Sequence, residues 1–410
     1  MVNSRAKRAA VGLLVAMVAI HVVLFWTLRR QVREGYSDFA SFYGAGRILH
    51  SGLHNKIYDY DTQWELQRNF APGVVIRHGP LLYNHAPFEA WLFSVFGAFS
   101  YPTAYILWNL TNAAILIGIA WLMTDYFEGK GLGLLLLAFL AFFPVLLVFV
   151  QGQDSILLLL LYTLALRNLR SGHEFAAGAL LALGLFKPQL VLPMALIFVF
   201  RGQIKVLAGF TASAGAMFAA SLAAVGWKDT INYPRYVWTL SQQRSIGAIT
   251  PANMPNLRGV LDGLVGSLGG GLLVAVLSVA IALGLTFAVA RVWNRTGDNE
   301  IGFALATVVT VLLSYHLYAY DATLLLLPIM VAAGVLVRDS LPSRTRTMAI
   351  WSVGCLMFTP LWVALLFGAR HLNVMALVIG FFAWILFSMG SKIGVNHATA
   401  AGAFSHRAHS

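Results

Sequence analysis

The chain has 410 residues, of which 59% are hydrophobic and only 11% are charged, and its mean hydropathy is +0.74. This composition excludes a soluble multidomain protein and indicates an integral membrane protein. The net charge of +12, from 28 Lys and Arg against 16 Asp and Glu, does not require a nucleic-acid partner, because basic residues gather at the cytosolic ends of membrane helices and contact anionic lipids.

The first apolar run, about residues 9–28, lies between two groups of basic residues. It is longer than the core of a signal peptide and has no small-x-small cleavage site, so we expect an uncleaved helix with a cytoplasmic N-terminus. A polar stretch of about 58 residues, 29–86, follows. Eleven more apolar runs bring the number of predicted transmembrane helices to about twelve: 102–124, 132–150, 154–168, 175–186, 190–200, 203–225, 270–292, 301–315, 321–337, 346–368 and 371–390.

Charge supports this topology. With twelve helices and both termini in the cytoplasm, fifteen basic residues fall on short inner segments, whereas only Lys187 and Arg370 fall on short outer connections. The inner residues are Arg5, Lys7, Arg8, Lys130, Arg167, Arg170, Arg201, Lys205, Arg291, Arg295, Arg338, Arg344, Arg346, Lys392 and Arg407. Segment 87–99 is predicted to be re-entrant or to lie on the surface, since a spanning helix there would reverse the asymmetry.

Four runs, 154–168, 175–186, 190–200 and 301–315, are shorter than the roughly 20 residues that a straight transmembrane helix needs. We expect broken or half-depth helices that are buried against their neighbours. The fold class is thus an all-α polytopic membrane protein.

No soluble domain is predicted. A single membrane domain, 1–390, carries two long outer loops, 29–86 and 226–256, and the small, polar segment 391–410 is expected to be a disordered cytoplasmic tail.

The first outer loop holds the first candidate for chemistry, Asp38. Phe39, Phe42, Tyr43 and Gly46 recur at helical spacing after it, which predicts an amphipathic helix at the membrane surface with Asp38 near its start. The alternative is that Asp38 only caps this helix.

A metal site is not expected. Asp59 and Asp61 resemble a D-x-D pair but are interpreted as a solvated turn, and the spacing of His78 and His85 is too weak to indicate a metal. The single cysteine, Cys355, excludes a disulfide framework and a thiolate cluster.

Three polar motifs interrupt apolar runs at predicted outer helix ends: Gly152-Gln153-Asp154, Lys187-Pro188-Gln189 and the segment 314–321, Ser-Tyr-His-Leu-Tyr-Ala-Tyr-Asp. Each alone is explained as a polar turn. Together with the first loop they place an acid, a cation and a histidine on one face, which predicts a site for a charged lipid headgroup and a hydroxyl. Lys187, beside a proline in apolar surroundings, is a plausible partner for a lipid phosphate.

The order of these motifs over roughly residues 30–335 resembles glycosyltransferase family 87. The family comprises polytopic mannosyltransferases of the C-type fold that use polyprenyl-phosphate-mannose. The resemblance implies inverting transfer of a mannosyl or other hexosyl unit to a lipid or glycan hydroxyl, at the outer face of a bacterial inner membrane. It also implies a long first outer loop with surface-lying helices, and a reaction that needs no metal or other cofactor.

The resemblance also implies roles for residues. Asp38 matches the general base that takes the acceptor proton. Lys187, His316 and Arg47 match contacts to the donor phosphate. The sugar or acceptor pocket would be formed by Gln153, Asp154, Tyr83, Asn84, His85, Tyr320 and Asp321.

Two other classes of membrane protein share some of these features. A secondary transporter or lipid-linked sugar flippase also uses broken helices and buried charges, but the long first loop and the absence of a visible repeat disfavour it. A structural or assembly protein would not need Asp38, Asp154 and Lys187 on one face. The sequence does not specify the sugar, the acceptor, the polyprenyl length or the oligomeric state.

Overall fold

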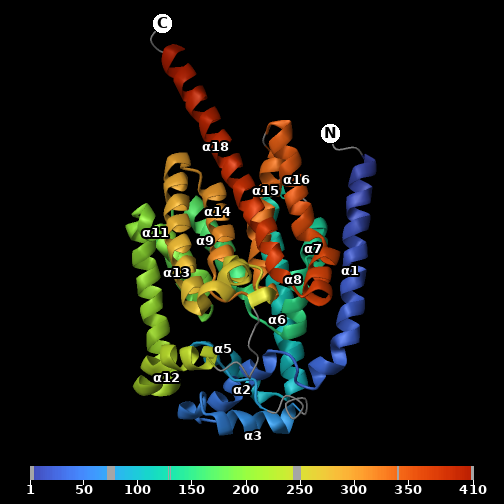
Figure 1. Cartoon of the computed structure of the whole chain (residues 1–410), viewed down its shortest axis with the longest axis vertical. Helices are drawn as coiled ribbons and strands as arrows, with labels where there is room; N and C mark the ends of the chain where they lie inside the picture. Colours follow the sequence, from blue (N-terminus) through green and yellow to red (C-terminus); the bar gives the residue numbers. More distant parts are fainter. Residues whose placement is uncertain are drawn as a thin grey trace.

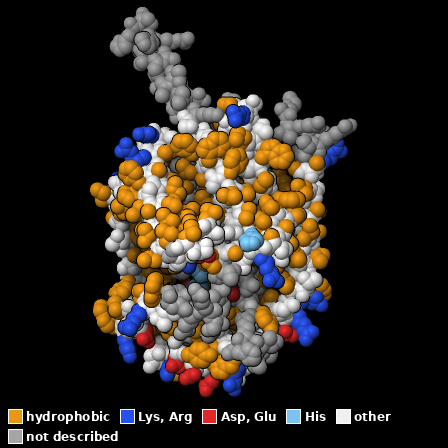
Figure 2. Space-filling model, viewed as in Figure 1, with side chains coloured by type: hydrophobic (Ala, Val, Ile, Leu, Met, Phe, Trp, Pro, Cys, Tyr) orange, Lys and Arg blue, Asp and Glu red, His pale blue; other side chains and the backbone are white. Residues whose placement is uncertain are grey.

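The computed structural model describes residues 4–71, 79–127, 129, 131–242, 251–338 and 341–407, and within these ranges every regular element is helical. His78 lies outside the described residues. On the face drawn in Figure 2, hydrophobic side chains form a broad band across the middle, and most charged side chains lie toward the two ends. Both features are as expected for a polytopic membrane protein.

The two termini lie at the same end of the molecule. α1 (Ser4–Arg33) begins there and α18 (Met375–Arg407) ends there (Figure 1). The opposite end, which is the predicted outer end, is covered by residues 34–71 and 79–100, which we call the outer cap. They form α2 (Phe39–His50), η1 (His54–Lys56), α3 (Tyr60–Phe70), α5 (Glu89–Ser94) and η2 (Val95–Ala98). The first long loop thus folds into helices at the end of the bundle away from the termini.

Among the described residues, six helices are long and apolar enough to cross a membrane, or up to eight if each of two bent pairs counts as one span. The six are α1, α6 (Tyr101–Met123) with η3 (Thr124–Phe127), α12 (Ile204–Gln242), α13 (Leu257–Thr296), η6 (Ala319–Leu325) with α15 (Leu326–Arg338), and η8 (Leu372–Val374) with α18. The bent pairs are α7 (Leu132–Ala141) with α8 (Phe143–Gln151), at 71°, and α16 (Ser343–Met357) with α17 (Thr359–Val363) and η7 (Ala364–Ala369), at 54°.

The four runs predicted to be short form short helices: α9 (Ser155–Arg170), α10 (Glu174–Leu183) with η4 (Gly184–Phe186), α11 (Pro188–Arg201) and α14 (Asn299–Leu313). Each of the twelve predicted runs therefore contains a helix or a bent pair, but length and composition support only six to eight spans, so twelve stays a prediction. Eleven of the fifteen residues of α14 are buried, as expected for a helix enclosed by its neighbours.

α2 differs from its prediction. Ten of its twelve residues are buried, so it is an internal helix of the outer cap and not an amphipathic helix with an open face. The Phe42 and Phe93 rings stack with centroids 4.6 Å apart, which joins α2 to α5. The aromatic residues at helical spacing predicted one buried face of α2, but they did not show that α5 and η2 cover its other faces.

Segment 87–99 does not cross the bundle. It forms the six-residue α5 and the four-residue η2, which lie in the outer cap beside α2. Gly46 allows the close approach, because a Cβ there would overlap the Phe93 carbonyl.

Two segments continue as helix where we expected loop or disorder. α12 bends at Gly226 (φ 76°) and runs on to Gln242, inside the second outer loop, before η5 (Pro251–Asn253). α18 continues to Arg407 through the predicted disordered tail. The four alanines between residues 398 and 403 favour helix, since alanine has the highest helix propensity.

Glycines at the α10–α12 contact provide a test of the packing. A Cβ at Gly178 would overlap the Val206 carbonyl, and a Cβ at Gly209 would overlap the Phe175 carbonyl. Membrane helices pack closely through such small residues. We therefore expect Gly178→Ala and Gly209→Ala each to lower the free energy of unfolding by roughly 1–3 kcal/mol.

The matched control is Gly215→Ala on α12, where a Cβ would have no neighbour within 4 Å. Thermal unfolding in detergent measures all three variants. Equal stability of Gly178→Ala and Gly215→Ala would contradict this packing.

Candidate active site

A buried lysine is held between two buried carboxylates. Lys187 Nζ lies 2.9 Å from Asp154 Oδ1 and 2.6 Å from Asp321 Oδ1, and all three side chains are at most 4% exposed. Ser155 Oγ donates a second hydrogen bond to Asp321 Oδ1 over 3.0 Å. Removing charged groups from water costs free energy unless opposite charges and hydrogen bonds compensate for it. Each of these three groups therefore needs the other two close by.

Three interruptions in the helices bring these charges together. Gly152 (φ 61°) ends α8, so that Asp154 lies at the start of α9. Lys187 directly precedes α11, whose first residue is Pro188. Proline has no N–H group, but at the first position of a helix that N–H would have no partner within the helix. Asp321 lies in η6, where its Oδ2 accepts a hydrogen bond from the Tyr318 N–H. The polar motifs predicted from the sequence are therefore the points at which the helices break.

Gln153 connects this ion pair to the outer cap. Its Oε1 accepts from Lys187 Nζ over 3.3 Å, and its Nε2 donates to Asp38 Oδ2 over 2.8 Å. The Asp38 side chain makes no capping bond to α2, which removes the alternative that it serves only as a helix cap. Asp38 is half-buried, so part of it remains accessible.

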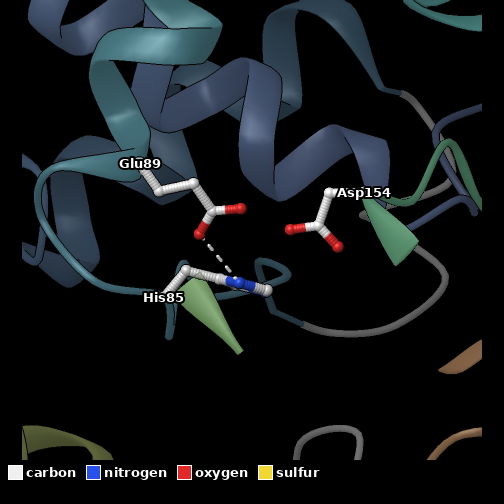
Figure 3. Close-up of side chains that lie close together, drawn as sticks. All are labelled: His85, Glu89 and Asp154. Atoms are coloured by element: carbon white, nitrogen blue, oxygen red, sulfur yellow. Dashed lines mark ion pairs between the residues drawn. The ribbon is translucent and has the colours of Figure 1, made fainter. Parts of the chain in front are cut away.

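Glu89 joins the site and was missed from the sequence. At the start of α5 it is only 2% exposed, and its Oε2 lies 3.0 Å from His85 Nδ1. Figure 3 shows the Glu89 and Asp154 carboxylates facing each other with His85 beside them. Burial and the charge of Asp154 raise the pKa of Glu89 well above its usual value, and burial lowers the pKa of His85 to about 4. The sequence signal that could have identified Glu89 is a carboxylate near the start of the otherwise apolar segment 87–99.

We call the five charged residues Asp38, Glu89, Asp154, Lys187 and Asp321 the acidic cluster. Tyr320, also predicted, lies against it, with its ring centroid 5.0 Å from Lys187 Nζ and stacked on Tyr318. Because Lys187 is already paired with two carboxylates, it is not a free cation for a phosphate. Its structural role is to hold Asp154 and Asp321 together.

The other predicted residues lie around the cluster with separate contacts. Arg47 donates to the Gly97 carbonyl over 2.9 Å, which ties α2 to η2. Tyr83 is buried and donates to the Ala86 carbonyl over 3.0 Å, whereas Asn84 is exposed. The structure therefore assigns Arg47 and Tyr83 hydrogen bonds within the outer cap.

The second of the two predicted outer loops packs against this part of the cap. The hydroxyls of Tyr233 and Tyr236, on the last part of α12, donate to the carbonyls of Asn84 and Tyr83. Asn256 caps α13 and donates to the Ser314 carbonyl over 2.6 Å. The two loops thus meet around the cluster, which the sequence alone did not indicate.

His316 lies close enough to Asp321 to feel its charge, but among the described residues its side chain makes no hydrogen bond to the cluster. Its ring packs edge-on against Tyr318 with centroids 5.2 Å apart. Burial, and secondarily the charge of Arg258, lowers the pKa of His316 to about 4. A neutral imidazole can donate a hydrogen bond to a phosphate but brings no positive charge.

The aspartates of the D-x-D pair have a structural explanation. Asp59 caps α3 by accepting from the Thr62 N–H over 3.1 Å, and Asp61 is exposed in the first turn of that helix. This agrees with a polar turn.

Removing the buried cation tests the ion pair. Lys187→Met leaves Asp154 and Asp321 buried without their counter-charge, and we expect a loss of about 3–5 kcal/mol in the free energy of unfolding. Lys205→Met is the control, since Lys205 is 81% exposed and 4.0 Å from Glu174, and we expect about 1 kcal/mol or less. Comparable losses in chemical unfolding would contradict the assignment.

The state of His316 predicts a pH dependence. The pKa of His316 is about 4 in the folded protein, against its ordinary value of 6.5 in the unfolded chain. Between pH 6.5 and pH 4, therefore, this histidine gains a proton in the unfolded chain and stays neutral in the folded protein. Stability is then fully present above pH 6.5 and is lost as the pH falls toward 4. Thermal unfolding at pH 7 and pH 5 should show a smaller loss for His316→Gln than for the wild type, and equal losses would contradict this.

The profile of glycosyltransferase family 87 matches residues 83–317, more than half of the chain. The match contains Glu89, Asp154 and Lys187, while Asp38 precedes it and Asp321 follows it. No curated protein matches the chain. The chain therefore belongs to glycosyltransferase family 87 and is a membrane glycosyltransferase.

Proposed function

We propose that the protein is an inverting glycosyltransferase that moves a mannosyl or related hexosyl unit from a polyprenyl phosphate to a hydroxyl of a lipid or glycan. The observation that carries this proposal is the Asp38 carboxylate, half-buried and held by Gln153 against the Lys187 ion pair. Family membership supports a sugar donor and an acceptor, and the finer identity of both is our proposal.

Asp38 is proposed as the general base. The acceptor oxygen attacks the anomeric carbon, the bond from that carbon to the phosphate oxygen breaks, and Asp38 takes the acceptor proton. A single displacement of this kind inverts the anomeric centre. The hydrogen bond from Gln153 Nε2 orients the carboxylate, and Gln153 is in turn fixed by Lys187.

The contacts to the phosphate require a revision. Lys187 is enclosed by two carboxylates, so it is not a ready phosphate ligand. Arg47 ties α2 to η2, whereas Arg258 lies close enough to His316 for its charge to act on that imidazole. We propose that His316 donates a hydrogen bond and that Arg258, whose charge acts on His316, supplies the positive charge. Arg258 stacks on the Tyr315 ring at 3.8 Å and donates to the Tyr315 carbonyl.

The surroundings of Arg258 suit a polyprenyl chain. Arg258 lines a small cavity together with Ser278, Tyr315 and the apolar side chains of Leu257, Val279, Ala282 and Leu313. Leu272 and Val276, further along α13, are 78% and 57% exposed, so they lie on the apolar surface around the helix bundle. A phosphate at Arg258 would therefore leave its hydrocarbon chain against a lipid-facing surface.

We propose that the acidic cluster faces the outside of a bacterial inner membrane. The helix ends away from it carry basic residues: Arg170, ending α9, and Arg338, ending α15, both pair with Glu300. This agrees with cytoplasmic termini under the positive-inside rule.

The proposal is tested by assaying purified protein with polyprenyl-phosphate-mannose and candidate glycolipid or glycan acceptors. Loss of a general base lowers the rate by roughly 10²–10⁴-fold, so we expect Asp38→Asn to lose at least about a hundredfold in kcat while remaining folded. Asp61→Asn, at an exposed position on α3, is the matched control and should keep its activity. Full transfer by Asp38→Asn would exclude the base assignment.

A further inference from the structure

Three side chains from different parts of the chain converge beside Lys187. His85 lies in the segment before α5, Glu89 begins α5, and Asp154 precedes α9. One possible ligand atom from each lies within 4.8 Å of the others (Figure 3). The ligand atoms of one metal ion usually lie somewhat closer together than this distance. Small movements of the three side chains would therefore let all of them bind one ion.

The carboxylates in this group lack the donors that their burial demands. Glu89 is 2% exposed and Asp154 is fully buried, yet Glu89 Oε1 and Asp154 Oδ2 have no hydrogen-bond partner among the described residues. The Tyr83 hydroxyl also lies within reach of Glu89, but its single proton is donated to the Ala86 carbonyl over 3.0 Å. Buried carboxylate oxygens without donors are costly, and the cost is removed by a cation or a proton.

Charge favours a cation. The acidic cluster contains four carboxylates and one ammonium group, which leaves three net negative charges if all are ionised. The proposed reaction brings a phosphate, a further anion, to this region. A divalent ion between Glu89 and Asp154 would offset most of the excess, whereas one shared proton would offset a third of it.

We propose that His85, Glu89 and Asp154 bind a divalent metal ion. One imidazole nitrogen with two carboxylates is a ligand set for Mn²⁺ or Zn²⁺ more than for Ca²⁺ or Mg²⁺, which prefer oxygen ligands alone. His85 is 18% exposed in its side chain while Glu89 and Asp154 are enclosed, so the ion would enter past His85.

The inference differs from the expectation of metal independence, which came from family resemblance and not from these side chains. The role of the ion rests on the proposed function, because it would lower the repulsion between the cluster and the leaving phosphate. Binding of the ion does not depend on the proposed function, because metal binding can be measured without any substrate. The competing arrangement is a proton shared by the Glu89 and Asp154 carboxyl groups, which stand close enough for a hydrogen bond.

The experiment is a titration of chelator-stripped, detergent-purified protein with Mn²⁺, in which free Mn²⁺ is followed by its electron paramagnetic resonance signal. We expect one Mn²⁺ per chain in the wild type, displaced by Zn²⁺. Glu89→Gln, which keeps the side-chain volume, and His85→Gln should each weaken binding at least tenfold. Using both variants keeps the test decisive if one of them does not fold.

Glu34→Gln is the matched control, because Glu34 is a partly exposed glutamate paired with Arg30 on α1. It should bind Mn²⁺ as the wild type does. Asp38→Asn should also bind Mn²⁺ while losing transfer, which separates this proposal from the proposed function. Absence of a stoichiometric site in the wild type, or unchanged binding by the folded glutamine variants, would overturn the metal site and leave the shared proton.

Discussion

The ion pair between Lys187, Asp154 and Asp321 is the interaction on which the rest of the site depends. Each charge comes from a different break in the apolar bundle, and each is nearly or fully buried. A charge so placed is costly unless its partners are present, so the three breaks must occur at one depth and face one another. The short helices α9, α10, α11 and α14 begin or end at or beside these breaks.

The ion pair also connects the bundle to the outer cap. Gln153 is next to Asp154 in the chain and bonds both Lys187 and Asp38, so the position of the proposed base is set by the same residues that stabilise the break. On the cap side, α2 is enclosed by α5 and η2, and Arg47 bonds the Gly97 carbonyl. A residue such as Arg47 thus affects the site by fixing α2.

Much of this arrangement was accessible from the sequence. Apolar run lengths predicted the helices and the short segments among them, and polar motifs at their ends predicted Asp154, Lys187 and Asp321 as neighbours. Glu89 was missed because a single glutamate before an apolar segment carries no periodic signal, and its pairing depends on contacts between residues 65 positions apart. The enclosure of α2 was missed for the same reason, since its covering helices follow 40 residues later.

The central claim is that sugar transfer takes place where the outer cap meets the broken helices. The most direct test is a structure of the protein with a non-transferable polyprenyl-phosphonate sugar, determined by cryo-electron microscopy. The account predicts the sugar beside Asp38 and Gln153, with the phosphonate toward His316 and Arg258 and the polyprenyl chain along α13. A ligand bound at the end of the bundle that holds the two termini would contradict it.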